Sequence, residues 1–239
     1  MIKLRENRLR FLIPNVITFL SLGCGVSAIM LAGSSQLTTA GILVLASYVL
    51  DLLDGEAARR LNAGTAFGLQ LDSLSDVVSL GVAPAMLAFF HLWHEGGVSH
   101  YLLWPATLFY AFAGAFRLAR FNLLPVKIGQ TESVGLTIST AGATLTLAVL
   151  SDLANPGEVL ANGFFILLLL TLAALMASRI SYPSIVWLFS RWWANLLYMA
   201  YLFVTLIVLQ LSFFHVWFLF NSGYVGLAVV RAGYRAIDE

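Results

Sequence analysis

The chain has 239 residues, of which 60% are hydrophobic and 10% are charged, and its mean hydropathy is +0.88. Soluble domains carry about 25% charged residues, so this composition excludes an ordinary soluble protein and predicts a polytopic membrane protein with a single domain, residues 1–239. The net charge of +1 gives no footprint for nucleic acid, and a single cysteine, Cys24, excludes a disulfide framework.

Apolar runs long enough to cross a bilayer recur along the whole chain. The predicted fold is all-α, a polytopic membrane bundle of about eight transmembrane helices. We expect these helices near residues 12–32, 37–58, 69–92, 101–121, 134–153, 159–178, 192–211 and 213–232.

The positive charges orient this bundle, because lysine and arginine collect in the cytoplasmic loops of membrane proteins. With the N-terminus in the cytoplasm and eight spans, all 13 lysines and arginines fall on the cytoplasmic side. The opposite loops hold Glu95, Asp152 and Glu158 instead. We therefore expect a multi-pass protein of the cell membrane with both chain ends in the cytoplasm.

Four aspartates interrupt the second and third apolar segments. Asp51 and Asp54 lie at the cytoplasmic end of the second segment, and Asp72 and Asp76 lie at the cytoplasmic start of the third. An aspartate at the centre of a bilayer costs roughly 2.5–3.5 kcal/mol on insertion scales, so such residues usually mark a function. A hairpin that turns between the segments would bring one pair from each helix to the same depth.

Four carboxylates at one depth repel one another unless cations neutralise them. Their oxygen atoms suit Mg²⁺ or Mn²⁺, and two such ions can clamp the attacking and leaving oxygens of a phosphoryl displacement. Gly55 and Gly68 leave room for a ligand beside the backbone, and Arg59 offers a guanidinium fork for a phosphate. The pattern favours phosphoryl or phosphatidyl transfer at a membrane surface. A cation-coupled transporter is the alternative, because carboxylates in membrane helices also serve ion coupling.

The spacing of these residues resembles the signature of a known family. Residues 51–76 match every fixed position of the pattern D-x2-D-G-x2-A-R-x8-G-x3-D-x3-D of the CDP-alcohol phosphatidyltransferases. Further segments are similar to the phosphatidylserine synthase branch of that family, namely Ile13-Pro14-Asn15 with Thr18, Gly81–Ala85, Arg117–Asn122 and Ser178–Ser184.

The resemblance implies an integral membrane enzyme that transfers a phosphatidyl group from CDP-diacylglycerol to an alcohol and releases CMP. For the branch it resembles, the acceptor is L-serine, and glycerol 3-phosphate or an inositol phosphate is the alternative. The resemblance also implies two divalent ions, Mg²⁺ or Mn²⁺, and a homodimer. The metal ligands would be Asp51, Asp54, Asp72 and Asp76, with Asp76 also the base; Asn15, Thr18, Gly55, Ala58, Arg59 and Gly68 would bind the nucleotide and the lipid diphosphate; Arg117 and Arg120 would bind the acceptor.

Simpler structural roles compete at several of these positions. Asn15 could cap a helix, and Arg117 and Arg120, three residues apart on one helical face, could serve only topology and headgroup contacts. The stretch Thr137–Thr140 stands where the branch usually has prolines, and it borders the predicted acceptor site. This change could alter the acceptor, or its hydroxyls could simply bond to helix carbonyls.

Three histidines, His91, His94 and His100, fall at the surface opposite the aspartates. The spacing of His91 and His94 is one that metal ligands use. Because the predicted topology separates these histidines from the aspartates by the membrane, we expect them to be solvated or interfacial and not part of that site.

Overall fold

The computed structural model describes residues 2–96, 98–123, 132–154, 162–183 and 213–237, and these fold predominantly into helices, as predicted. The described part also contains an antiparallel pair of short strands that was not predicted, β1 (Glu132–Val134) and β2 (Ser181–Pro183), with Ser133 opposite Tyr182. The helices are α1 (Ile2–Gly33), α2 (Leu37–Arg60), α3 (Ala66–Asp76), η1 (Val77–Val82), α4 (Ala83–Glu95), α5 (His100–Leu123), α6 (Ile138–Ala154), α7 (Asn162–Ala177) and α10 (Phe213–Ile237).

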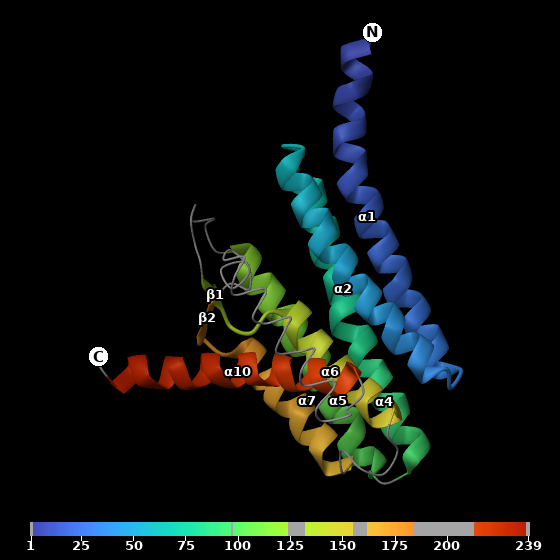
Figure 1. Ribbon diagram of the computed structural model, residues 1–239, viewed down its shortest axis with the longest axis vertical. Coiled ribbons are helices and arrows are strands. Elements are labelled where there is room, and N and C mark those ends of the chain that lie inside the picture. Colours follow the sequence, from blue (N-terminus) through green and yellow to red (C-terminus); the bar gives the residue numbers. More distant parts are fainter. Residues whose placement is uncertain (1, 97, 124–131, 155–161, 184–212, 238–239) are drawn as a thin grey trace.

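The helices pack around α6, which contacts α2, α4, α5, α7 and α10. Every residue of α6 from Ala141 to Leu150 is buried. Figure 1 shows α1 alongside α2, with the first turns of α1 projecting past the end of α2, and α10 running across the bundle. α1 begins at Ile2, well before the expected start at residue 12.

Four of the predicted membrane spans coincide with helices that are long and apolar enough to cross a membrane. α6 and α7 are apolar but shorter, the expected span at 192–211 lies outside the described residues, and α10 runs across the other helices in Figure 1. The predicted count of eight spans is therefore not confirmed. The helices of the described chain that are long and apolar enough to cross a membrane are Arg10–Gly33, Leu37–Arg60, Ala66–Glu95 and His100–Leu123.

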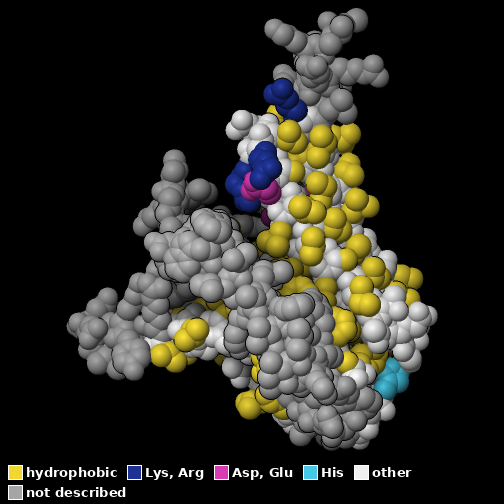
Figure 2. All heavy atoms as spheres, in the orientation of Figure 1, with side chains coloured by type: hydrophobic (Ala, Val, Ile, Leu, Met, Phe, Trp, Pro, Cys, Tyr) yellow, Lys and Arg dark blue, Asp and Glu magenta, His cyan; other side chains and the backbone are white. Residues whose placement is uncertain are grey.

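The outer faces of the long helices are apolar. Large hydrophobic side chains are exposed along α1 and α5, among them Phe19, Met30, Phe112 and Phe116. Figure 2 shows the part of this apolar surface that lies along α1, with lysine, arginine and acidic side chains gathered towards one end of it. A continuous exposed apolar surface of this kind is typical of contact with lipid, so the protein is a membrane protein.

Hydroxyl-bearing residues hold α1, α2 and η1 together. Ser21 Oγ lies 2.7 Å from Ser47 Oγ, and Ser79 Oγ donates a hydrogen bond of 3.1 Å to the Ser21 carbonyl. All three serines are buried. Because lipid tails are as apolar as leucine, helices in a membrane associate through close packing and hydrogen bonds such as these.

The π-helical segment η1 interrupts the long helix Ala66–Glu95 because of Pro84. Proline has no N–H to bond the Leu80 carbonyl, and in a regular α-helix its ring would clash with that carbonyl. The wider turn of η1 relieves the clash. The Leu80 carbonyl then approaches α6 so closely that a Cβ on Gly142 would lie 3.2 Å from the carbonyl carbon. Glycine at 142 is what permits this contact between η1 and α6.

Gly142→Ala should therefore destabilise the bundle. The added methyl group overlaps the Leu80 carbonyl, so α6 and η1 must move apart, at a cost of roughly 1–3 kcal/mol. The matched control is Gly23→Ala, inside α1, where a Cβ would meet nothing within 4 Å. We expect thermal unfolding in detergent at a lower temperature for Gly142→Ala than for Gly23→Ala or the wild type. If Gly142→Ala and Gly23→Ala unfolded at the same temperature, the close approach of the Leu80 carbonyl to residue 142 would be refuted.

Candidate functional site

The hairpin between α2 and α3 brings the predicted aspartates together. Asp51 lies on α2, Asp72 and Asp76 lie on α3, and one carboxylate oxygen from each lies within 4.8 Å of the others. Asp76 is buried, and the other two are partly buried. The predicted meeting of carboxylates from the two helices is confirmed.

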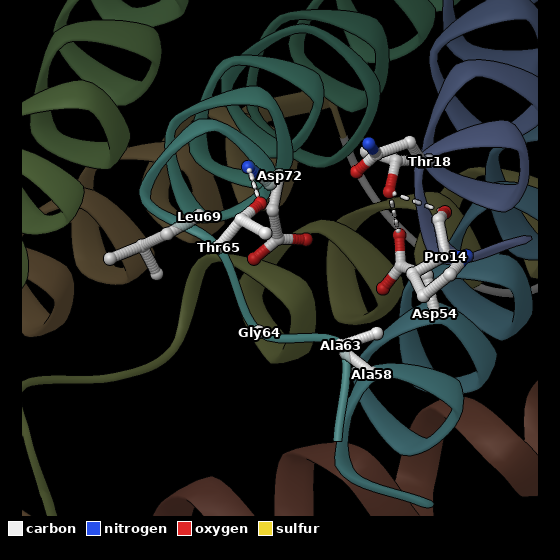
Figure 3. Close-up of a pocket in the computed structure, with 12 residues that line it drawn as sticks. Pro14, Thr18, Asp54, Ala58, Ala63, Gly64, Thr65, Leu69 and Asp72 are labelled. Carbon is white, nitrogen blue, oxygen red and sulfur yellow. Dashed lines mark hydrogen bonds between the residues drawn. The ribbon is translucent and has the colours of Figure 1, made fainter. Parts of the chain in front are cut away.

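Asp54 lies beside this group and is held from α1. Its Oδ2 accepts a hydrogen bond of 2.7 Å from Thr18 Oγ1, which also lies 3.0 Å from the Pro14 carbonyl oxygen. A hydroxyl has one proton, and the nearer, charged acceptor takes it. Figure 3 shows the carboxylates of Asp54 and Asp72 facing the same space from α2 and α3.

A cavity of about 210 Å³ lies between α1, α2 and the start of α3. Five of the residues predicted to bind the nucleotide line it, together with two of the motif aspartates. Several further lining residues were not predicted. The predicted residues are Asn15, Thr18, Gly55, Ala58 and Gly68 with Asp54 and Asp72, and the others are Pro14, Ala63, Gly64, Thr65 and Leu69.

Thr65 shapes one wall of the cavity. It is the N-cap of α3, and its Oγ1 accepts a hydrogen bond of 2.9 Å from Gly68 N. A Cβ on Gly68 would lie 3.1 Å from Thr65 Oγ1 and 3.3 Å from Asn15 Oδ1. Because residue 68 is glycine, the Thr65 hydroxyl and the Asn15 amide of α1 can lie close together on one wall of the cavity. A threonine three residues before the motif glycine is the sequence signal that could have identified this cap.

Arg59 lies beside the cavity and not among its lining residues. Its Nε and Nη2 donate to Glu56 Oε2 at 3.1 and 2.9 Å, and Arg60 Nε donates to the other oxygen of Glu56 at 2.6 Å. Nη1 of Arg59 would lie 3.5 Å from a Cβ on Gly55, which does line the cavity. An exposed guanidinium at this edge has the reach to meet a phosphate, and that contact stays a prediction.

α6 adds a polar contact to the aspartates. Ser139 Oγ donates a hydrogen bond of 3.2 Å to Asp51 Oδ2. Thr137 Oγ1, from the residue just before α6, donates instead to Thr140 Oγ1 at 2.7 Å. In the stretch Thr137–Thr140, the Ser139 hydroxyl therefore bonds to a motif aspartate, whereas the hydroxyls of Thr137 and Thr140 bond to each other.

The two arginines near the end of α5 have different surroundings. Arg117 is buried, and it lies close enough to Asp76 and Asp51 to interact with both electrostatically. Arg120 ties α5 to β1 and to the end of α7 through backbone carbonyls. These carbonyls are those of Val134, Ala177 and Ser178, at 3.1, 3.0 and 2.9 Å.

The acidic group can hold a metal ion. Three carboxylates offer oxygens within 4.8 Å of one another, and Asp54 adjoins the same space. Carboxylate oxygens are the donors that Mg²⁺ and Mn²⁺ prefer. Like charges this close repel strongly where the effective dielectric constant is low, so a cation between them stabilises the arrangement.

Comparison with known proteins identifies the family. The sequence model of the family described as CDP-alcohol phosphatidyltransferase matches residues 11–177, which include all four aspartates. The chain is 35% identical over 205 residues to the CDP-diacylglycerol–serine O-phosphatidyltransferase of Helicobacter pylori strain J99, a match that covers 84% of this chain and 83% of that protein. Proteins of the same name from Bacillus subtilis and Methanocaldococcus jannaschii are 35% and 36% identical, over 72% of this chain and over 89% and 74% of theirs. The chain therefore belongs to the CDP-alcohol phosphatidyltransferase family, a family of enzymes of phospholipid biosynthesis.

Proposed function

We propose that this protein transfers a phosphatidyl group from CDP-diacylglycerol to L-serine, giving phosphatidylserine and CMP. Support comes from the family and from the relatives named CDP-diacylglycerol–serine O-phosphatidyltransferase. The observation that carries the proposal is the meeting of Asp51, Asp72 and Asp76 next to a cavity lined by the predicted nucleotide-binding residues.

The four motif aspartates would hold two divalent ions, Mg²⁺ or Mn²⁺. When bound, such ions neutralise charge on the diphosphate and on the departing CMP. The protein supports the aspartates with hydrogen bonds from Thr18 to Asp54 and from Ser139 to Asp51. Bonds of this kind orient metal ligands and are commonly worth about 10–100-fold in metal affinity.

The cavity would take the cytidine end of the lipid substrate. Its volume of about 210 Å³ is below the roughly 300–1,000 Å³ of pockets for drug-sized ligands, so it suits a head group and leaves the acyl chains in the bilayer. Gly55, Ala58 and Gly68 keep its walls free of long side chains. Asn15 supplies an amide for hydrogen bonding, and Arg59 would meet a phosphate at the edge.

Asp76 would act as the general base. The serine hydroxyl gives its proton to the Asp76 carboxylate as its oxygen attacks the phosphorus that carries the diacylglycerol. A P–O bond to serine forms, the P–O bond to CMP breaks, and CMP leaves with the electron pair. Asp76 is the most buried of the three clustered aspartates, so bulk water has least access to it, which limits competing hydrolysis.

Arg117 would bind the carboxylate of the serine acceptor. A buried guanidinium beside Asp76 can pair with a carboxylate through two parallel hydrogen bonds. Arg120, whose guanidinium donates to backbone carbonyls at the end of α7, would hold this end of α5, and so Arg117, in place. A phosphate-bearing acceptor such as glycerol 3-phosphate carries more negative charge and would favour further basic residues at the site.

We further propose that the site faces the cytoplasm from the cell membrane. The excess of lysine and arginine on one side of the predicted topology supports this orientation. The chain would form one domain, and the family resemblance predicts a homodimer.

Release of CMP from CDP-diacylglycerol by the purified protein is the first test, with serine, glycerol 3-phosphate or inositol phosphate as the acceptor. We expect release with serine that requires Mg²⁺ or Mn²⁺ and stops on chelation, because without a cation the carboxylates repel the diphosphate. Asp76→Asn should lower the rate by at least about a hundredfold, as loss of a general base does. The control Glu56→Gln, which removes a carboxylate of α2 outside the cavity lining, should keep the metal dependence.

Other results would separate the parts of this proposal. Release with another acceptor only would keep the reaction class and exclude serine. Release that persists without divalent ions would exclude the metal role of the aspartates. Ion uptake by sealed vesicles, with no CMP released for any acceptor, would favour the cation-coupled transporter considered from the sequence.

Thr18→Val should weaken metal binding through Asp54. Valine has the shape of threonine but cannot donate to Asp54 Oδ2. We expect the Mn²⁺ concentration for half-maximal activity to rise about tenfold, whereas Thr18→Ser, which keeps the hydroxyl, should stay near the wild type. An unchanged Mn²⁺ dependence in Thr18→Val would mean that Asp54 needs no support from α1.

Arg117 and Arg120 should respond differently to replacement by lysine. Arg117→Lys keeps the charge but loses the fork of donors, so the KM for serine should rise about tenfold with little change in unfolding temperature. Arg120→Lys loses bonds to the carbonyls around β1 and α7, so its unfolding temperature should fall. The opposite pattern, with serine affinity lost at Arg120 and stability lost at Arg117, would exchange the two proposed roles.

A further inference from the structure

A second group of metal-ligating side chains lies at the far end of the helix that carries Asp72 and Asp76. His91 and Glu95 belong to the last turns of α4 and Asp152 to the end of α6, and one ligand atom from each lies within 4.8 Å of the others. At 1.5 Å per residue, about 22 Å of helix separates His91 from Asp76. This group is therefore distinct from the motif aspartates.

His91 is buried, so the expectation of a solvated or interfacial histidine is wrong at this position. Its side chain is 2% exposed and that of Asp152 is 9% exposed, whereas that of Glu95 is 40% exposed. The His91 ring packs edge-on against Phe165, with ring centroids 5.1 Å apart. The buried carboxylate of Asp152 lies in the same apolar surroundings, so it requires a hydrogen-bonded or charged partner.

Both carboxylates approach the same nitrogen of His91. Nε2 lies 2.9 Å from Asp152 Oδ2 and 3.6 Å from Glu95 Oε1. One N–H makes one good hydrogen bond, and 3.6 Å is too long for a second. A cation in place of the Nε2 proton would engage the ring and both carboxylates at once, with the ring proton on Nδ1.

The two neighbouring histidines face other partners. His94 Nε2 lies 3.0 Å from Ser35 Oγ, and its Nδ1 lies 2.5 Å from the Phe90 carbonyl oxygen. The ring of His100 lies against Trp93, with centroids 4.0 Å apart. Among the described residues the group thus comprises one imidazole and two carboxylates.

We propose that His91, Glu95 and Asp152 bind one divalent transition-metal ion, for which Zn²⁺ is the best fit. One imidazole nitrogen with two carboxylate oxygens suits Zn²⁺, whereas Mg²⁺ and Ca²⁺ prefer oxygen ligands alone. The i, i+4 spacing places His91 and Glu95 on one face of α4, and Asp152 adds a ligand from α6. Glu95, on the exposed side, gives the ion access from solvent. The ion ties the end of α4 to the end of α6.

The zinc content of the full-length protein tests this site. The protein is stripped with a chelator, mixed with Zn²⁺ in a large excess of Mg²⁺ that occupies the motif aspartates, and desalted before metal analysis. We expect one Zn²⁺ per chain in the wild type and in Asp76→Asn, and binding at least about tenfold weaker in Glu95→Gln. Zn²⁺ should raise the unfolding temperature of the wild type but not of Glu95→Gln, because a ligand of the folded state stabilises it.

The matched control is His94→Ala, which removes a histidine of the same helix that faces Ser35 and should retain the zinc. Glu95→Gln changes an exposed side chain, so it carries the test if His91→Ala does not fold. The site is overturned if the wild type holds no Zn²⁺, if Glu95→Gln binds it with unchanged affinity, or if Asp76→Asn loses it. Each readout is metal content or unfolding temperature, so none depends on phosphatidyl transfer.

Discussion

The repulsion among carboxylates buried between apolar helices is the constraint on which the rest of this structure depends. The hairpin of α2 and α3 brings them together, but the hairpin does not support them alone. Three other helices each contribute one polar side chain, Thr18 from α1, Arg117 from α5 and Ser139 from α6. A bound cation would complete the balance of charge. The site is therefore a property of the bundle, although its signature occupies one short stretch of sequence.

The backbone next to the site has its own constraint. Asp76 is the last residue of α3, and η1 begins immediately after it. Pro84 causes this wider turn because it has no N–H to donate to the Leu80 carbonyl, and that carbonyl rests against Gly142 of α6. Irregular turns of this type are frequent at functional sites. Here the turn sets how α6, and so Ser139, approaches the aspartates.

The motif could be interpreted from the sequence because its geometry is local. Residues at equal distances from a helical turn come to the same depth, so the meeting of Asp51 with Asp72 and Asp76 follows from spacing alone. Ser139 lies 88 residues from its partner Asp51 along the chain, and only tertiary packing joins them. The surroundings of Arg120 could not be predicted from the sequence either. Its spacing from Arg117 suggests that the two arginines share one role, but Arg120 bonds to backbone carbonyls whereas Arg117 lies near the aspartates.

Helix boundaries were predicted less well, for a physical reason. Hydropathy detects the part of a helix that lies in lipid, whereas a helix ends where its hydrogen bonding ends. α1 therefore begins at Ile2, since the basic residues before the apolar run are compatible with helix outside the bilayer. The pairing of β1 with β2 depends on two segments far apart in sequence, and neither has the length or alternation of a recognisable strand.

α6 connects the two ends of the molecule. Ser139 meets Asp51 at one end, Asp152 meets His91 at the other, and the residues from Ala141 to Leu150 between them are buried. Apolar packing tolerates a small sliding of one helix along another, whereas a hydrogen bond is lost after a shift of about 1.5 Å, one residue of helix. The contact at the far end therefore resists sliding of α6 along α4, which continues the helix that carries Asp72 and Asp76. The two polar contacts, about 20 Å apart along α6 at 1.5 Å per residue, thus hold this helix in register with α2 at one end and with α4 at the other.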